Sequence, residues 1–125
     1  MRASPLFAFA APLVSAIQLL EPFANSLVAK GQMHNITWTS VDTDPQAFSI
    51  FLVNFVDYPP FYTKVAANVP TCAGQFEVIV PCEVNSSYGF QFNAINGNNV
   101  YDIYAQTAKF YVEGSCESVS GCLTK

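Results

Sequence analysis

Short apolar or alternating runs, separated by clusters of Gly, Pro, Asn and Asp, make up nearly the whole chain after residue 16. In Gln32–Thr39, the apolar Ile36 and Trp38 alternate with polar residues, which is the period-two pattern of a strand with one buried face. We therefore expect Trp38 in the core. Phe48–Phe55 is nearly all apolar, which suits a central strand. Helical periodicity is hard to find, so the pattern predicts an all-β protein.

Further strands are predicted on the same grounds. They are Ile17–Leu20, Tyr62–Val69, Gln75–Val80, Tyr88–Ile95, Val100–Tyr104 and Lys109–Val112. The strongest turn signals are Asp42–Pro45 and Asn96–Asn99, because Asp, Asn and Gly accept the dihedral angles of tight turns. Seven or eight short strands at this spacing are typical of an antiparallel immunoglobulin-like β-sandwich. We expect one sandwich domain of about seven strands over residues 17–125, ending in a short Cys-containing tail.

The first 16 residues have the pattern of a secretory signal peptide. Arg2 supplies a positive charge, and Leu6–Val14 is an apolar run too short to span a bilayer. Small or β-branched residues at Val14-Ser15-Ala16 suit cleavage after Ala16. No later segment is apolar enough for a membrane span, and the polar C-terminus lacks the hydrophobic tail of a GPI signal. We therefore expect secretion, to the extracellular space or the cell wall.

Two further features agree with export. Asn35-Ile36-Thr37 and Asn85-Ser86-Ser87 are N-glycosylation sequons. An even number of cysteines in an exported chain indicates disulfides, and the four here are Cys72, Cys82, Cys116 and Cys122. A zinc site is disfavoured, because the spacing contains no CxxC and the chain has a single histidine, His34.

Four cysteines allow three pairings. Cys72 and Cys82 flank one predicted strand, whose extended length of about 33 Å far exceeds the Cα separation of about 4.4–6.8 Å in a disulfide. They pair with each other only if a turn at Ala73-Gly74 folds the chain back. In an immunoglobulin-like order, the ends of the fifth and last strands share one end of the sandwich. This favours Cys82 with Cys116 or Cys122, and a local Cys116–Cys122 loop remains open.

Composition narrows the classes of function. The chain is 51% hydrophobic, 14% aromatic and 11% charged, which excludes disorder. Lys and Arg together number 5, and the formal net charge is −4. Nucleic-acid binding is disfavoured, because a binder needs a basic surface to displace counterions from the phosphates.

The sequence contains few side chains in arrangements typical of catalytic sites. His34, beside a sequon, is expected to be an ordinary exposed residue. Asp42 and Asp44 are the closest carboxylate pair, but they lie in a turn beside Pro45, where Asp bonds the backbone. No serine has a histidine and an acid in a recognisable arrangement, and no Gly-rich phosphate loop occurs. We expect a protein that is not an enzyme and that uses no metal or cofactor.

Aromatic side chains near loops are better candidates for function. Planar rings cover the apolar faces of sugars, while neighbouring polar groups bond the hydroxyls. Tyr58, Phe61 and Tyr62 lie in a proline-broken loop, and Tyr101 and Tyr104 lie near the Asn-rich hairpin. We take both groups as candidate ligand-binding patches. The alternative is that these rings cap the sandwich.

A set of short motifs, in this order, resembles one family. They are Ile36–Ser40, Leu52–Asn54, Ala67–Val69, Pro81, Tyr88, Ile103–Thr107 and Phe110. Over residues 17–112 the chain resembles the N-terminal immunoglobulin-like domain of fungal cell-wall synthesis proteins of the Kre/Knh type, which also defines Ser/Thr-rich GPI-anchored fungal membrane proteins. The resemblance implies an extracellular or wall-associated β-sandwich and supplies no catalytic residues. Members of the family often continue into a Ser/Thr-rich stalk and a GPI signal, and from the residues after Val112 we expect neither here.

The resulting hypothesis is a secreted, non-catalytic module of the fungal cell wall that binds or organises β-glucan. Two alternatives stay open. One is a secreted effector that binds a host protein, and the other is a small carbohydrate-active enzyme. Retention on insoluble glucan favours the first hypothesis, and release of reducing ends from glucans favours the enzyme.

Overall fold

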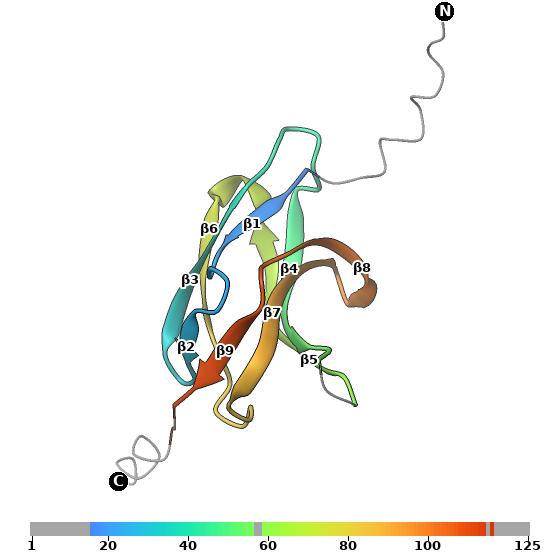
Figure 1. Ribbon diagram of the computed structural model, residues 1–125. Helices are drawn as coiled ribbons and strands as arrows, with labels where there is room; N and C mark the ends of the chain where they lie inside the picture. The colour runs from blue at the N-terminus through green and yellow to red at the C-terminus, as the bar shows by residue number, and fades with distance from the viewer. Residues whose placement is uncertain (1–15, 57–58, 115, 117–125) are drawn as a thin grey trace, which may run out of the picture.

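Nine strands in two facing sheets make up the part of the chain that the computed structural model describes, which is residues 16–56, 59–114 and 116 (Figure 1). The three-stranded sheet has the order β1 (Gln18–Glu21), β3 (Met33–Thr39), β6 (Gln75–Ile79). The six-stranded sheet has the order β2 (Leu27–Ala29), β9 (Phe110–Glu113), β7 (Ser87–Asn96), β4 (Ala47–Asn54), β5 (Phe61–Pro70), with β8 (Asn99–Gln106) paired to β7. The predicted all-β, immunoglobulin-like sandwich is confirmed.

The core lies between the two sheets and follows the predicted alternation. Ile36 and Trp38 of β3 point inward and are buried. The Trp38 ring meets Phe48 edge-on at 5.1 Å between centroids, and its Nε1 donates to the carbonyl oxygen of Thr71 at 2.8 Å. This bond satisfies the one polar group of the buried indole. The predicted core position of Trp38 is confirmed.

β4 is the central strand and is buried on both faces, as its apolar sequence predicts. Its inner residues Phe48, Ile50 and Leu52 join the main core. Its outer residues Phe51 and Val53 pack with Ile95 of β7 in a second, smaller cluster, which we call the outer cluster, and Val100 of β8 packs against it. The outer face of the large sheet therefore has its own apolar packing, which holds β8 in place.

The predicted strands are all present, with ends displaced by a few residues. The hairpin turn between β7 and β8 occurs where Asn96–Asn99 predicts it. The sequence did not predict β2, which has three residues and pairs in parallel with β9. A strand this short has no repeating pattern of its own and depends on its partner strand.

A disulfide joins Cys82 and Cys116, with 5.7 Å between the Cα atoms. This is one of the two pairings that the strand order favours. Cys72, which we expected in a disulfide, is an exposed free cysteine. It lies in the 3₁₀ turn Thr71–Ala73, at the opposite end of β6 from Cys82, so strand β6 keeps the two cysteines apart. Cys122 lies outside the described residues.

No helix within the described residues is long and apolar enough to cross a membrane. The predicted signal peptide falls on residues 1–16, of which 1–15 lie outside the described part of the chain.

Candidate ligand-binding groove

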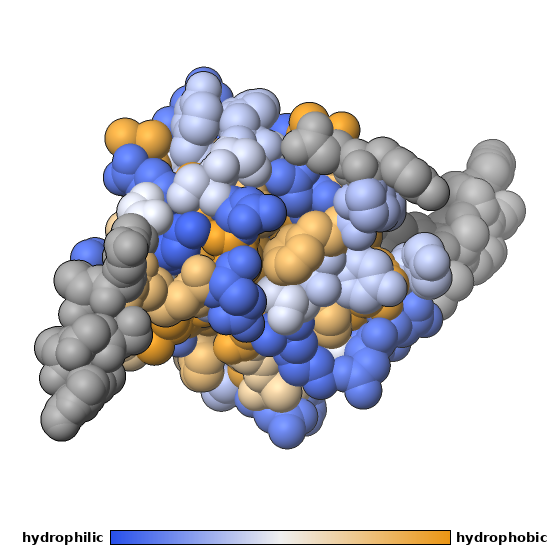
Figure 2. All heavy atoms as spheres, turned by 90° about the horizontal axis from the view of Figure 1, so that it is seen from below, coloured by the Kyte–Doolittle hydropathy of each residue, from blue (hydrophilic) through white to orange (hydrophobic). Residues whose placement is uncertain are grey.

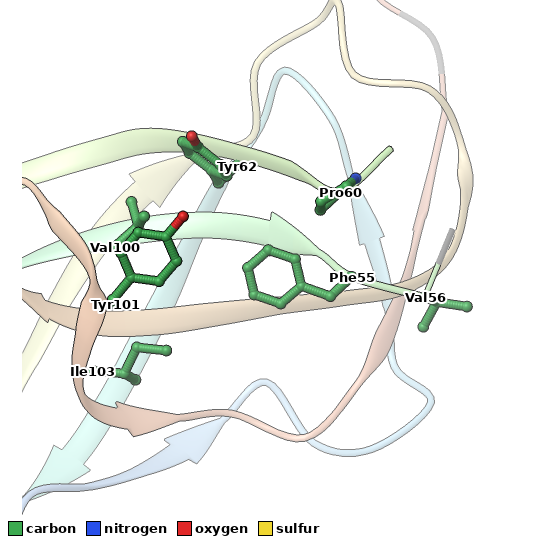
Figure 3. Close-up of a pocket in the computed structure, with 7 residues that line it drawn as sticks. All are labelled: Phe55, Val56, Pro60, Tyr62, Val100, Tyr101 and Ile103. Atoms are coloured by element: carbon green, nitrogen blue, oxygen red, sulfur yellow. The ribbon is translucent and has the colours of Figure 1, made fainter. Parts of the chain in front are cut away.

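An apolar groove of about 480 Å³ lies on the outer face of the large sheet, between β8 and the adjoining ends of β4 and β5 (Figure 3). Its lining residues are Phe55, Val56, Pro60, Tyr62, Val100, Tyr101 and Ile103. Figure 3 shows the rings of Phe55, Tyr62 and Tyr101 around one shared space. Residues from three separate segments of the chain therefore make one site.

Strand register decides which side chains reach the groove. Tyr62 pairs with Val53 across β4 and β5, so both side chains point to the outer face. Phe55 has the same parity as Val53 and follows the end of β4. On β8, Tyr101 and Ile103 line the groove, and so does Val100, which also packs against the outer cluster at the start of the strand.

The rings of the groove are unusually exposed for a folded domain. The exposed fractions are 91% for Tyr101, 51% for Tyr62 and 46% for Phe55. Apolar surface gathered in this way marks an interaction site more often than isolated exposed residues do. Hairpin hydrogen bonds fix the backbone beneath Tyr101, since its N–H donates to Oδ1 of Asn99 at 3.1 Å.

Two of the predicted site residues line the groove, and the other described ones lie outside it. Tyr62 and Tyr101, from two different predicted patches, line the same groove. Phe61 points to the other face of its strand, where its ring contacts Phe90 edge-on at 6.1 Å between centroids. Tyr104 is half-buried against the core, and burial together with Asp102 raises the pKa of its phenol. Tyr58 lies outside the described residues.

Sequence reasoning missed the other lining residues, Phe55, Val56, Val100 and Ile103. Phe55 was placed at the end of the predicted central strand, where an aromatic side chain is expected to be buried by neighbouring strands and so not to bind a ligand. One signal was available for Phe55, because it continues the outer-face alternation of Phe51 and Val53 beyond the residue at which β4 ends.

The apolar surface continues beyond the groove on the same face. Tyr111 of β9 pairs with Leu27 of β2 on one side and with Tyr88 of β7 on the other. The two tyrosine rings are 4.8 Å apart between centroids, and Leu27 is 64% exposed. Figure 2 views the molecule from its lower end in Figure 1 and shows hydrophobic surface in patches among hydrophilic residues.

The candidate polar residues have structural roles. The carboxylate of Asp44 accepts the N–H of Val41 at 2.8 Å, as predicted for a turn aspartate, and the N–H of Ala16 at 2.6 Å. His34 is half-buried rather than exposed, with Nε2 at 2.8 Å from the carbonyl oxygen of Ala29. Within the described residues, no group of three or more His, Cys, Asp or Glu side chains lies together to hold a metal ion.

Both sequon asparagines are exposed. Asn35 lies in β3 on the outer face of the small sheet, where its Nδ2 donates to Oε1 of Gln75 at 3.2 Å. Asn85 lies in the turn between β6 and β7. Neither side chain is enclosed by the fold, so both sites are accessible to a glycan.

Comparison with known proteins finds related fungal sequences. The family model described as the Kre9/KNH-like N-terminal Ig-like domain matches residues 21–112. A UPF0619 GPI-anchored membrane protein of Aspergillus fumigatus is 33% identical over 108 residues, which cover 86% of this chain and 49% of the relative. A second UPF0619 GPI-anchored membrane protein, from Schizosaccharomyces pombe, is 29% identical over 80% of this chain and 38% of its own length.

The serine/threonine-rich protein adg2 of Schizosaccharomyces pombe is 27% identical over 106 residues, which cover 83% of this chain and 15% of that protein. The chain thus spans about half or less of the length of these relatives. No solved structure gives a significant match.

Proposed function

Because this chain belongs to the family of Kre9/KNH-like N-terminal Ig-like domains, we propose that it is an extracellular module of the fungal cell surface or wall that binds β-glucan in its groove, without catalysis. Two of its relatives carry the name of GPI-anchored membrane protein, which supports a cell-surface location. The signal-peptide pattern of residues 1–16 supports entry into the secretory route.

The observation that carries the proposal is the convergence of three exposed rings, Phe55, Tyr62 and Tyr101, on one groove. Its volume of about 480 Å³ falls within the range of about 300–1,000 Å³ of small-ligand pockets. Planar rings cover the apolar C–H faces of a sugar, and the two tyrosine hydroxyls supply hydrogen bonds to sugar hydroxyls.

The charge of the groove favours a neutral ligand. None of the described residues that line it is Lys, Arg, His, Asp or Glu. A neutral polysaccharide loses no ion pairing there, whereas an anionic one would face a chain with a net charge of −4. β-Glucan is neutral and abundant in fungal walls, so it is the ligand we propose.

Retention on insoluble glucan tests the proposal. We expect the wild-type protein to sediment with β-glucan, and we expect Tyr62→Ala and Tyr101→Ala each to weaken binding about tenfold, equivalent to about 1.4 kcal/mol. Phe23→Ala is the control, because Phe23 is an exposed aromatic residue in the loop between β1 and β2 and does not line the groove. It should bind like the wild type.

Three outcomes separate the rival functions. Full retention of the Tyr62→Ala, Tyr101→Ala double variant would remove the groove as the site. Failure of the wild type to bind any glucan, together with capture of a purified host protein, would favour an effector. Release of reducing ends during incubation with glucan would show an enzyme.

A further inference from the structure

A second cavity, of about 380 Å³, lies at the end of the sandwich where the β6–β7 turn meets the start of β5. Its apolar walls include Pro59, Phe61 and Phe90, and polar side chains at its border include Glu83, Asn85 and Ser87. Asn85 and Ser87 are the first and third residues of a glycosylation sequon. A sequon asparagine therefore lines a cavity that also contains aromatic rings.

The turn that carries Asn85 is held firmly. Val84, directly before it, is buried, and its carbonyl oxygen accepts a hydrogen bond from Nζ of Lys30 at 2.5 Å. Cys82, two residues earlier, is tied to Cys116 by the disulfide. The backbone at Asn85 is thereby fixed on both the core side and the disulfide side, so a group attached to its side chain starts from a defined position.

The cavity wall is apolar where a sugar face would meet it. Phe61 is half-buried, with its ring edge-on to Phe90, and Pro59 is exposed. Asn54, which also lines the cavity, already donates from Nδ2 to the carbonyl oxygen of Tyr88 and accepts the N–H of Val56 at Oδ1. Ring stacking, supplemented by the Glu83 carboxylate and the Ser87 hydroxyl, is the chemistry that this cavity offers.

We propose that this cavity is the docking site of the first N-acetylglucosamine of an N-glycan on Asn85. Attachment forms a bond from C1 of the sugar to Nδ2 of Asn85, which loses one amide proton, and the lipid pyrophosphate of the oligosaccharide donor leaves. The tether gives the sugar a high effective concentration at the cavity. The inference rests on the proposed export of the chain but not on glucan binding.

Asn35 supplies an internal comparison. It lies mid-strand on the outer face of the small sheet, and its amide donates to Gln75. Asn35 also lines a hollow, of about 630 Å³, together with Phe76, but this hollow is flatter and more open to solvent than the cavity at Asn85. We therefore expect a glycan on Asn35 to extend into solvent and to leave the stability of the fold unchanged.

Stepwise removal of the glycan tests the proposal. The full chain is secreted from a eukaryotic host as the Asn35→Gln variant, and occupancy of Asn85 is measured by mass spectrometry. Endoglycosidase H, which cleaves high-mannose glycans such as those added by yeast, leaves one N-acetylglucosamine on one portion of the protein, and PNGase F removes the whole glycan from a second, untrimmed portion. We expect the intact and trimmed forms to share one Tm and the bare form to unfold about 4 °C lower, the shift expected for the loss of one ordinary contact in a domain of this size.

Matched variants test whether the lost sugar causes the fall in Tm. PNGase F also converts Asn85 to aspartate, which adds a negative charge. Ser87→Ala lacks the glycan but keeps an uncharged Asn85, so it should show the same low Tm as the bare form. Phe61→Leu should reduce the difference between trimmed and bare forms to the error of measurement, whereas Tyr62→Ala should preserve it. In the Asn85→Gln background, removal of the Asn35 glycan should not change Tm.

Several outcomes would overturn the inference. They are an unoccupied Asn85, an unchanged Tm on removing its last sugar, and an equal fall in Tm when the Asn35 glycan is removed. Because the readout is Tm, a failure of glucan binding leaves it unaffected, and the two proposals fail separately.

Discussion

At the scale of the residue, position within an alternating strand decides the role of each aromatic ring. Phe61 and Tyr62 are neighbours in the chain, yet Phe61 contacts Phe90 and Tyr62 lines the groove. The same holds for Ile103, in the groove, and Tyr104, against the core. Aromatic residues that are adjacent in a strand sequence therefore lie on opposite faces of the strand and do not form one patch.

Gly31 is the residue whose replacement should be most damaging near the disulfide. Its φ is +79°, and a Cβ there would lie 2.7 Å from Sγ of Cys116 and 3.3 Å from Sγ of Cys82. We expect Gly31→Ala to lower the free energy of unfolding by about 2–3 kcal/mol, from the backbone conformation and the contact together. Urea denaturation monitored by tryptophan fluorescence measures this.

Gly97→Ala is the matched control. Gly97 also has a positive φ, of +59°, but a Cβ there would have nothing within 4 Å. We expect a loss of about 1 kcal/mol from the backbone alone. Equal losses in the two variants would contradict the proposed contact of residue 31 with the sulfur atoms.

At the scale of the element, β8 and the disulfide determine the two sites. β8 pairs with β7, and its residue Val100 packs against the outer cluster, so that Tyr101 and Tyr62 line the same groove. The disulfide fastens the β6–β7 turn to the residues after β9, and this turn carries Asn85. The outer cluster thus supports the groove, while the disulfide and the core residue Val84 support the turn at Asn85.

Removal of the disulfide should be costly. Cys82 and Cys116 are separated by 34 residues, and closing a loop of this length stabilises a fold by about 3–4 kcal/mol in the chain-entropy account. We expect the Cys82→Ser, Cys116→Ser double variant to lose that amount in urea denaturation.

Cys72→Ser serves as the comparison for the disulfide variant. Cys72 is exposed and free, so the change in unfolding free energy should stay within about 0.5 kcal/mol. A large loss in Cys72→Ser would show that Cys72 is bonded in the purified protein, against the structure.

At the scale of the whole molecule, the two sheets present different outer faces. The small sheet exposes polar residues such as Asn35 and Glu77 together with Met33 and Ile79, whereas the large sheet exposes the groove and the adjoining Tyr88 and Tyr111. Among the described residues, the large sheet gathers three exposed rings around one groove, and it is the face that we propose for glucan binding. A glycan on Asn35 would lie on the other sheet, away from that face.

Glucan binding should be nearly independent of salt. The described lining of the groove is uncharged and its proposed ligand is neutral, so screening has no ion pair to weaken. We expect retention on insoluble glucan to change less than about twofold between 0.05 and 1 M sodium chloride. A steep fall with salt would indicate binding through charged residues elsewhere on the surface.

The sequence by itself determined every strand except β2, the inward residues of β3 and the class of fold. Ile36 and Trp38 could be assigned to the core from alternation alone, because the direction of a side chain on a strand is a local property of the backbone. The order of short motifs also placed the chain in its family, which the comparison confirms.

Only the tertiary structure decided which distant residues meet. Tyr62 and Tyr101 were predicted in separate patches, and their meeting depends on the pairing of β4 with β5 and on the packing of Val100. Likewise, the expected strand order favoured two partners for Cys82 and left other pairings open, and the tertiary structure joins Cys82 to Cys116. Contacts of this kind depend on register and packing between strands far apart in the chain, which no local pattern encodes.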